Sequence, residues 1–499
     1  MASYTSIGAY DATVLFPSFR GLMQYGDGIN TDPRYARDAM NVETPGGVLQ
    51  PCAANKLLAP VLDAPIETLA ILYRRWHTVA TEKELFVAAC AGKLYAALPG
   101  ADAWTELTMP EGISSYQSNV WSWVTYEINP VGGNAPVDVM LLSNALDGMV
   151  MVRGDDLSVS TIDTKKKFGV IARYAERIWG GAIIDDPDML AYSAPYDPTD
   201  WEAKIEIPED GAGDIQQPSW DGDSFTALEP FGSQLIAFKR TRVWRILGTD
   251  PGEYTFKEQY GGGAPYAATI AADAERIFML TQSGVAMYDG LSVTPFQQEY
   301  IRLLMQRANT DALDQASACF WRGRYYCALP LDESLTNNAV LIFDTVDGSW
   351  LVREDVQVED FLPAETGLFY TSATTPGRVW EWSENSWEHG EATKSGTRWI
   401  SGWVDLGYKD IVKGGFEVYL LVEVQDRPVQ VNVAIQTEKK LKRKSYLVEP
   451  SAPGKHPKQK RLRFGGTGRR FRLIIETPPD TPPWRIVSGI TVKVGIDPD

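Results

Sequence analysis

Short pairs of apolar strands return along this chain at a regular interval. In one pair, residues 177–180 and 189–193 are apolar runs joined by the turn 185–188. Proline presets φ in that turn, and its aspartate side chains bond their own backbone. Asp197-Pro198 ends the second run, and Trp201 is expected to pack back on the hairpin. One hairpin cannot bury its apolar face alone, so it needs neighbours of the same kind.

Six further pairs follow the same pattern. They cover residues 84–90 with 93–97, 137–142 with 149–152, 233–238 with 242–247, 276–280 with 285–290, 324–329 with 339–344, and 367–371 with 378–382. The return strands start about 40 to 56 residues apart, and four-stranded blades at such a period are typical of a β-propeller. The sequence therefore predicts an irregular propeller of six or seven blades over residues 61–387. The alternative is a large β-sandwich with coincidental spacing.

The segments around this array predict an all-β chain with a second domain. Residues 1–60 are loop-rich, with a hairpin over 41–49 turning on Gly46-Gly47, and are expected to join the propeller. Residues 388–398 are expected to be a linker. Predicted strands at 416–424, 429–436, 460–464, 470–476 and 486–494 make residues 399–499 a C-terminal β-sandwich. Within the array, apolar residues at helical spacing over 297–316 predict a short helical insertion.

Length and cysteine content restrict the class of protein. A chain of 499 residues exceeds one ordinary core, in agreement with two domains. There is no run of eighteen apolar residues and no signal-peptide pattern, so neither a membrane span nor secretion is expected. The four cysteines (Cys52, Cys90, Cys319 and Cys327) lack a framework spacing, and we expect buried free thiols. Cys319 facing Cys327 across a hairpin is the alternative.

The charge of the chain is unevenly distributed. The net charge is −18, yet residues 438–472 hold thirteen Lys and Arg against two Glu, which leaves about −29 on the remainder. An acidic body argues against general nucleic-acid binding, because phosphates are repelled. The same repulsion would keep DNA from adhering to the wall of a conduit.

We call the cations of this segment the basic strip. Its members are Lys439, Lys440, Lys442, Arg443, Lys444, Lys455, Lys458, Lys460, Arg461, Arg463, Arg469, Arg470 and Arg472. Three interpretations stay open: a solvated face, a contact with the acidic face of a neighbouring subunit or partner, and direct contact with DNA. Few aromatic residues lie among the cations, so base stacking is not indicated.

No motif for catalysis or metal binding stands out. None of the three histidines lies near a second histidine or a cysteine at ligand spacing, so no metal site is predicted. The chain lacks a nucleophile elbow and a phosphate-binding P-loop. Propellers often carry glycosidase sites, but residues 344–350 only half match the Asp-box of sialidases. We therefore expect no enzyme activity and no cofactor.

Several of these segments resemble proteins of bacteriophage tails. Residues 35–51 resemble the opening of tail proteins of tailed phages, and the hairpin that ends at Trp201 resembles a hairpin of the same proteins. Residues 277–290 and 325–350 fit the same pattern. The C-terminal domain, with residues 471–475 and 486–494, is similar to the terminal β-domain of the packaged-DNA stabilisation protein, or tail nozzle, of short-tailed phages.

The resemblance implies a structural protein of the virion tail, assembled in the cytoplasm of the bacterial host. It implies a homo-oligomer, a six-fold ring below the portal and adaptor proteins of the head–tail connector. Tail fibre or tail tip proteins would be its other neighbours. Such a ring extends the channel, helps to close it, and passes viral double-stranded DNA during ejection. A tail hub or receptor-binding component is the main alternative, and a propeller glycosidase is a further one.

Overall fold

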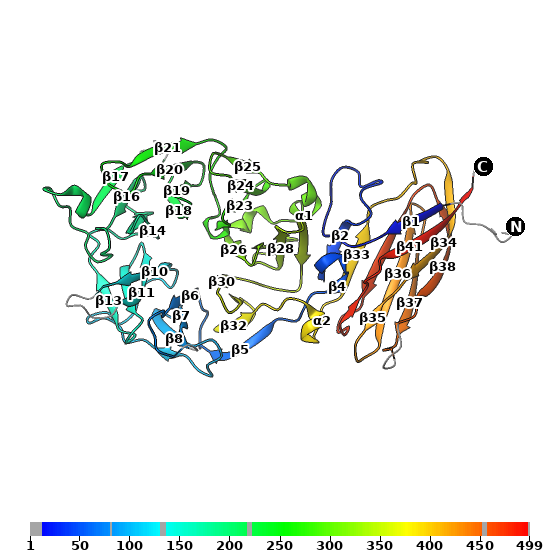
Figure 1. The fold of residues 1–499 in the computed structure, drawn as a ribbon, viewed down its shortest axis with the longest axis horizontal. Helices are drawn as coiled ribbons and strands as arrows, with labels where there is room; N and C mark the ends of the chain where they lie inside the picture. Colours follow the sequence, from blue (N-terminus) through cyan, green and yellow to red (C-terminus); the bar gives the residue numbers. More distant parts are fainter. Residues whose placement is uncertain (1–11, 80–81, 130–135, 217–221, 452–456, 498–499) are drawn as a thin grey trace.

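The protein consists of two β-domains that lie side by side (Figure 1). The computed structural model describes residues 12–79, 82–129, 136–216, 222–451 and 457–497. Seven four-stranded antiparallel sheets form a ring, and a five-stranded sheet and a further four-stranded sheet stack beside it. The fold is the all-β class that the sequence predicts, a propeller joined to a sandwich. Its blade number is seven.

The first four blades follow one another along the chain. Blade 1 comprises β6 (Thr68–Tyr73), β7 (Glu84–Cys90), β8 (Lys93–Ala97) and β9 (Thr105–Glu106); blade 2 comprises β10 (Ser122–Ile128), β11 (Val137–Asn144), β12 (Gly148–Arg153) and β13 (Val159–Ile162). Blade 3 comprises β14 (Val170–Tyr174), β15 (Arg177–Gly181), β16 (Met189–Tyr192) and β17 (Gly213–Gln216); blade 4 comprises β18 (Phe225–Phe231), β19 (Gln234–Lys239), β20 (Val243–Leu247) and β21 (Thr255–Gln259).

The last three blades complete the ring. Blade 5 comprises β22 (Ala271–Ala272), β23 (Ile277–Thr281), β24 (Gly284–Tyr288) and β25 (Val293–Pro295); blade 6 comprises β26 (Ser317–Trp321), β27 (Arg324–Leu329), β28 (Ala339–Asp344) and β29 (Ser349–Arg353). Blade 7 comprises β30 (Phe361–Pro363), β31 (Leu368–Thr371), β32 (Arg378–Glu381) and β5 (Lys56–Val61). Because β5 precedes blade 1, a strand from the beginning of the chain closes the ring.

The predicted strand pairs are the two middle strands of each blade. They are apolar because both faces of a blade pack against neighbouring blades; all eight residues of β11, for example, are buried.

Cys319 and Cys327 lie apart, because successive side chains of a strand point to opposite faces of its sheet. Cys319 lies opposite Tyr326, so Cys327 points to the other face of blade 6. All four cysteines are free and buried, as predicted.

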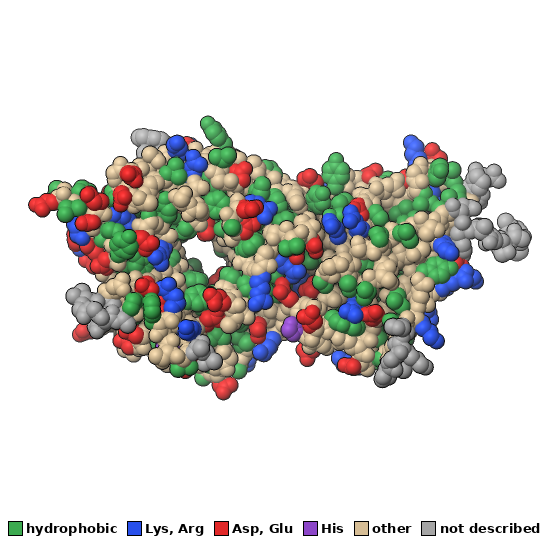
Figure 2. All heavy atoms as spheres, in the orientation of Figure 1, with side chains coloured by type: hydrophobic (Ala, Val, Ile, Leu, Met, Phe, Trp, Pro, Cys, Tyr) green, Lys and Arg blue, Asp and Glu red, His purple; other side chains and the backbone are tan. Residues whose placement is uncertain are grey.

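A short helical insertion lies between blades 5 and 6, as predicted. It contains η5 (Gln298–Tyr300), α1 (Arg302–Met305) and η6 (Thr310–Gln315). Leu304 and Leu313 are buried against the neighbouring strands and belong to the largest hydrophobic core of the molecule. Two short 3₁₀ turns, η3 (Pro208–Asp210) and η4 (Ala267–Thr269), lie in other loops of the propeller. Figure 2 shows an opening through the centre of the ring.

The second domain is a sandwich of two sheets. One sheet has the order β2 (Ala36–Met40), β33 (Thr397–Ser401), β39 (Phe471–Thr477), β36 (Val429–Thr437) and β37 (Leu441–Val448). The other has the order β1 (Ala12–Phe16), β41 (Ile490–Asp497), β34 (Val412–Leu420) and β38 (Lys460–Gly468). A two-stranded ribbon of β35 (Glu423–Val424) and β40 (Trp484–Arg485) lies beside them.

The predicted domain boundaries need a correction at both ends of the propeller. Residues 1–60 do not simply join the propeller, because β1 pairs with β41 and β2 pairs with β33 inside the sandwich. Only β5 enters the ring. The predicted hairpin is present as β3 (Val42–Glu43) and β4 (Gln50–Pro51) around η1 (Pro45–Gly47). The predicted linker 388–398 includes the end of α2 (Ser386–His389) and the start of β33.

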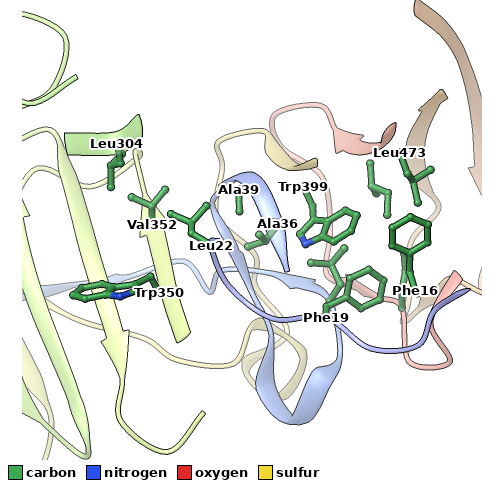
Figure 3. Close-up of a cluster of buried hydrophobic side chains, with 14 of the residues drawn as sticks. Phe16, Phe19, Leu22, Ala36, Ala39, Leu304, Trp350, Val352, Trp399 and Leu473 are labelled. Atoms are coloured by element: carbon green, nitrogen blue, oxygen red, sulfur yellow. The ribbon is translucent and has the colours of Figure 1, made fainter. Parts of the chain in front are cut away.

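The two domains share one continuous core. The backbone N–H of Leu22 donates to the carbonyl of Trp350 in blade 6, at an N···O distance of 2.6 Å. The N–H of Asn41 donates to the carbonyl of Val352 at 3.0 Å. A single hydrophobic cluster runs from Trp350 past Leu22 to Trp399 in the sandwich (Figure 3). The domains are therefore joined by packed side chains and not by a loose linker.

Gly21 provides the first test of this junction. A Cβ at this position would lie 1.8 Å from the carbonyl oxygen of Trp350, so the chain cannot keep its approach with any side chain there. We expect Gly21→Ala to lower the free energy of unfolding by about 1–3 kcal/mol or more, the range of overpacked sites. Urea denaturation followed by tryptophan fluorescence measures the change. Gly252→Ala is the control, because nothing lies within 4 Å of its Cβ position. Equal stability of the two variants would contradict the expectation.

Candidate functional site

The basic strip occupies the edge of the sandwich where both sheets end. β37 is the last strand of the five-stranded sheet and pairs with β36, and β38 is the last strand of the four-stranded sheet and pairs with β34. Figure 2 shows Lys and Arg side chains at the end of the sandwich that lies far from the propeller, near β38. The strip thus follows two open strand edges.

Between the predicted strands 429–436 and 460–464, where the sequence indicates a strand end and a loop, the structure contains a complete strand. β37 pairs with β36 over eight residues, from Leu441 opposite Gln436 to Val448 opposite Val429. Its residues 441–445 are all exposed. A run of charged residues does not show the apolar alternation by which a strand is recognised. β37 forms because β36 offers it a free row of backbone groups.

Alternation along β37 and β38 turns some lysines toward the space between the two sheets. Lys442 and Lys444 lie opposite Ile435 and Val433, whose side chains are in the core. The Lys444 ammonium lies 5.8 Å from the centre of the Phe464 ring, and that of Lys460 lies 5.8 Å from the Tyr446 ring. The alkyl stems cover the apolar edge while the ammonium groups remain exposed. Inward-pointing lysines at an edge also hinder the addition of another strand.

The arginines on the outer faces are paired within the molecule. Arg461 and Arg463 both contact Glu417, whose side chain is only 1% exposed, and the Arg463 Nε lies 2.7 Å from its carboxylate. The hydroxyl of Tyr419 donates to the same carboxylate at 2.7 Å. Arg443 forms an ion pair with Glu476 at 2.7 Å. These three arginines stabilise the sandwich and are less available to a partner.

Arg470 and Arg472 leave the edge and face the propeller side of the sandwich. Their guanidinium carbons lie 5.1 Å and 4.7 Å from the ring centre of Trp403. Arg470 also approaches Glu438 at 3.6 Å, and the backbone N–H groups of Arg469 and Arg470 each donate to the Glu438 carboxylate at 3.1 Å. The sequence gives no local signal for the role of Trp403, because it lies more than sixty residues before these arginines.

The structure therefore divides the basic strip into three groups. Among the described residues, eight members form no ion pair; besides Lys460 and Arg472 they are Lys439, Lys440, Lys442, Lys444, Lys458 and Arg469. Lys460 belongs with them, above Tyr446, and Lys455 lies outside the described residues. This exposed group contrasts with the propeller, where residues 56–384 hold 24 Lys and Arg against 47 Asp and Glu. An acidic domain and a basic edge are thus held in one rigid molecule.

Four carboxyls in the described part of the chain have raised pKa values, those of Glu43, Glu229, Glu359 and Asp360. Burial raises the pKa of Glu229 to about 7 and that of Asp360 to about 6. Glu229 is on β18 in blade 4, and Asp360 precedes β30 in blade 7, where it accepts hydrogen bonds from Ser317 and from the backbone of Phe361. They do not form a pair within one blade.

Neither a metal cluster nor a membrane-spanning helix is found in the part of the chain that the structure describes. No three His, Cys, Asp or Glu residues there are placed to hold one ion. No helix there is long and apolar enough to cross a bilayer.

The solved structures that resemble this chain have only remote sequence similarity to it. No protein-family model and no curated protein sequence matches the chain. Similar solved structures include the Pan2 WD40 domain of Neurospora crassa, with 10% identity, a TM-score of 0.38, and coverage of 67% of this chain and 97% of that one. PorZ, a type-IX secretion system component of Porphyromonas gingivalis, has 11% identity, a TM-score of 0.38, and coverage of 70% and 42%. The α-L-arabinofuranosidase Arb93A of Fusarium graminearum has 8% identity, a TM-score of 0.33, and coverage of 67% and 97%.

Glu229 gives a pH-dependent prediction. Its pKa is raised in the folded state, so its favourable contribution is present below the unfolded value near 4.5 and is lost as the pH rises through 7. Glu229→Gln should therefore match the wild type at pH 4 and exceed its stability above pH 7 by up to about 3 kcal/mol. Urea denaturation at several pH values measures this difference. Glu253→Gln, in an exposed turn, is the control. A stability difference independent of pH would overturn the assignment to burial.

Proposed function

We propose that the chain is a structural subunit of a bacteriophage tail, a nozzle protein that forms a six-fold ring below the portal and adaptor. The ring extends the DNA channel, helps to close it, and passes the double-stranded DNA during ejection. It works without catalysis or a cofactor. The observation that carries the proposal is the rigid joining of an acidic propeller to a sandwich with an exposed basic edge. The resemblance of several segments to phage tail proteins supports it.

Charge explains how such a subunit serves as a conduit. The excess of carboxylates on the propeller repels DNA phosphates, so a duplex that passes an acidic wall has little tendency to bind to it. The channel is the space that the six copies enclose, and the opening in each propeller is separate from it. Portal, adaptor, and tail fibre or tail tip proteins contact the two ends of the ring.

Charge also supports contacts between neighbouring subunits. In a ring, one surface of each subunit meets a different surface of the next one. The exposed lysines at residues 439–444 are suited to the acidic propeller of a neighbour, and opposite charges both steer and align the encounter. A contact of this kind weakens as salt screens the charges.

Labelling of particles tests the function directly. Gold-labelled antibodies against this chain are applied to the particles produced from the genome that encodes it, and electron microscopy locates the label. We expect label at the single tail vertex, next to a ring-shaped density. Label on side fibres would replace the proposal by receptor binding. Particles without any label would overturn a structural role in the virion and direct attention to glycosidase assays.

Charge reversal tests the assembly mechanism. The variant Lys439→Glu, Lys440→Glu, Lys442→Glu and Lys444→Glu should shift the purified protein from rings to monomers, because like charges then face each other. Sedimentation velocity at low salt measures the shift. The matched control reverses four exposed lysines outside the strip: Lys83, Lys257, Lys394 and Lys409. Rings that persist in the first variant, or dissociate equally in both, would rule out the basic strip as the subunit contact.

A further inference from the structure

A cavity of about 510 Å³ lies at the junction between the propeller and the sandwich. Arg37 and Asp38 of β2, Arg398 of β33, and Trp403 and Arg472 are among its lining residues. Its apolar walls are side chains of the shared core, such as Leu304 and Val352. Four guanidinium groups, those of Arg37, Arg307, Arg398 and Arg472, line the cavity together with the carboxylates of Asp27, Asp38 and Glu354. Arg307 is paired with Asp332 and Glu354, so the other three arginines supply the unused donors.

The guanidinium groups have hydrogen-bond donors to spare. Arg472 donates from Nε to Gln436 at 2.9 Å, and no hydrogen bond within the described residues uses its two terminal NH₂ groups. Arg37 donates to the carbonyls of Tyr25 at 2.9 Å and Gly26 at 3.2 Å, so three of its five N–H groups remain. The Nε of Arg398 lies 2.9 Å from the Asp38 carboxylate. The two terminal NH₂ groups of Arg398 form no hydrogen bond within the described residues and so remain available as donors.

The guanidinium groups repel one another in this cavity, although the carboxylates of Asp27, Asp38 and Glu354 lie among them. Burial and the positive charge of Arg37 lower the pKa of Arg472, although Asp38 acts against this. Burial and the charge of Arg302 lower the pKa of Arg37. Arginine remains protonated in proteins, so the repulsion persists at any physiological pH. A bound anion would remove this repulsion and satisfy the free donors.

The geometry favours phosphate over a carboxylate. A tetrahedral phosphate accepts hydrogen bonds from several directions, which matches donors on three separate segments, whereas a carboxylate accepts mainly in its own plane. The cavity volume lies within the range of small-molecule sites and is larger than the volume of a bare ion. The rigid junction holds the cavity open in advance, so little ordering is required on binding.

We propose that this junction cavity binds a phosphate group, either free phosphate or the phosphoryl group of a mononucleotide. Arg37, Arg398 and Arg472 donate to its oxygens. The phosphate binds as the dianion, because its oxygens accept more strongly than those of the monoanion from the unused N–H donors of the three arginines. The site is independent of the proposed role in a phage tail, and it concerns the region where the propeller and the sandwich meet.

Isothermal titration calorimetry on the full chain tests the proposal, with inorganic phosphate and AMP as separate probes at constant ionic strength. We expect saturable binding of one equivalent that strengthens from pH 5.5 to 8, as the second proton leaves the phosphate. Arg472→Gln should weaken binding about tenfold or more, since charge-assisted hydrogen bonds are lost. Arg443→Gln, in the strip but outside the cavity, should bind as the wild type does. Tighter binding of AMP identifies a nucleotide site, and equal binding identifies free phosphate.

Three results would overturn the proposal. The first is the absence of heat from both probes at millimolar concentrations, at least 10 times that of the protein. The second is an equal loss of affinity in Arg472→Gln and Arg443→Gln, and the third is an affinity that does not change with pH. Thermal melting without ligand confirms that each variant is folded. If Arg472→Gln does not fold, Arg472→Lys takes its place. It keeps the charge and loses the planar fork, so it should bind more weakly than the wild type.

Discussion

The backbone pairing of Leu22 with Trp350 is the contact on which the arrangement of both domains depends. It connects blade 6 to the strand β2 through a segment whose Gly21 allows no side chain. From β1 in the sandwich, the chain closes the ring with β5, passes through seven blades, and returns to the sandwich beside its point of entry. Both crossings therefore lie in one region, and the continuous core around Trp399 fixes the angle between the domains.

The closure of the ring beside this junction uses buried charge. The side chain of Arg353 is 2% exposed, forms an ion pair with Asp355 at 3.2 Å, donates to Asn55 at 3.3 Å, and lies 4.5 Å from the centre of the Trp382 ring. Burial raises the pKa of nearby Glu43, although Arg353 acts against this. A buried pair adds little net stability, but a wrong partner for either charge is costly. The network therefore favours this one pairing of the N-terminal segment with blade 7.

How well this fold can be predicted from sequence depends on how far apart the paired strands lie along the chain. The middle hairpins of the blades are local, so β7 and β8 or β27 and β28 were located to the residue. Pairing of β1 with β41 joins the two ends of the chain, and no local pattern indicates it. The basic strip was recognised as one feature by composition. Its division into a lysine edge, arginines on Glu417, and Arg472 in the junction cavity depends on side-chain direction and tertiary contacts.

The open edge of the sandwich restricts how any partner associates with it. Both sheets end there with unpaired backbone groups, which normally invite another strand. Strand addition would enclose the inward ammonium groups of Lys442 and Lys444, and burying unpaired charge is costly. Under the proposed function, a partner would therefore supply carboxylates, as the acidic propeller of a neighbouring subunit would. Because heterologous contacts either close into rings or grow into filaments, the fixed angle at the Leu22 junction would decide between these outcomes. Under the proposed function, the same rigid core that orients the domains also determines that the assembly closes.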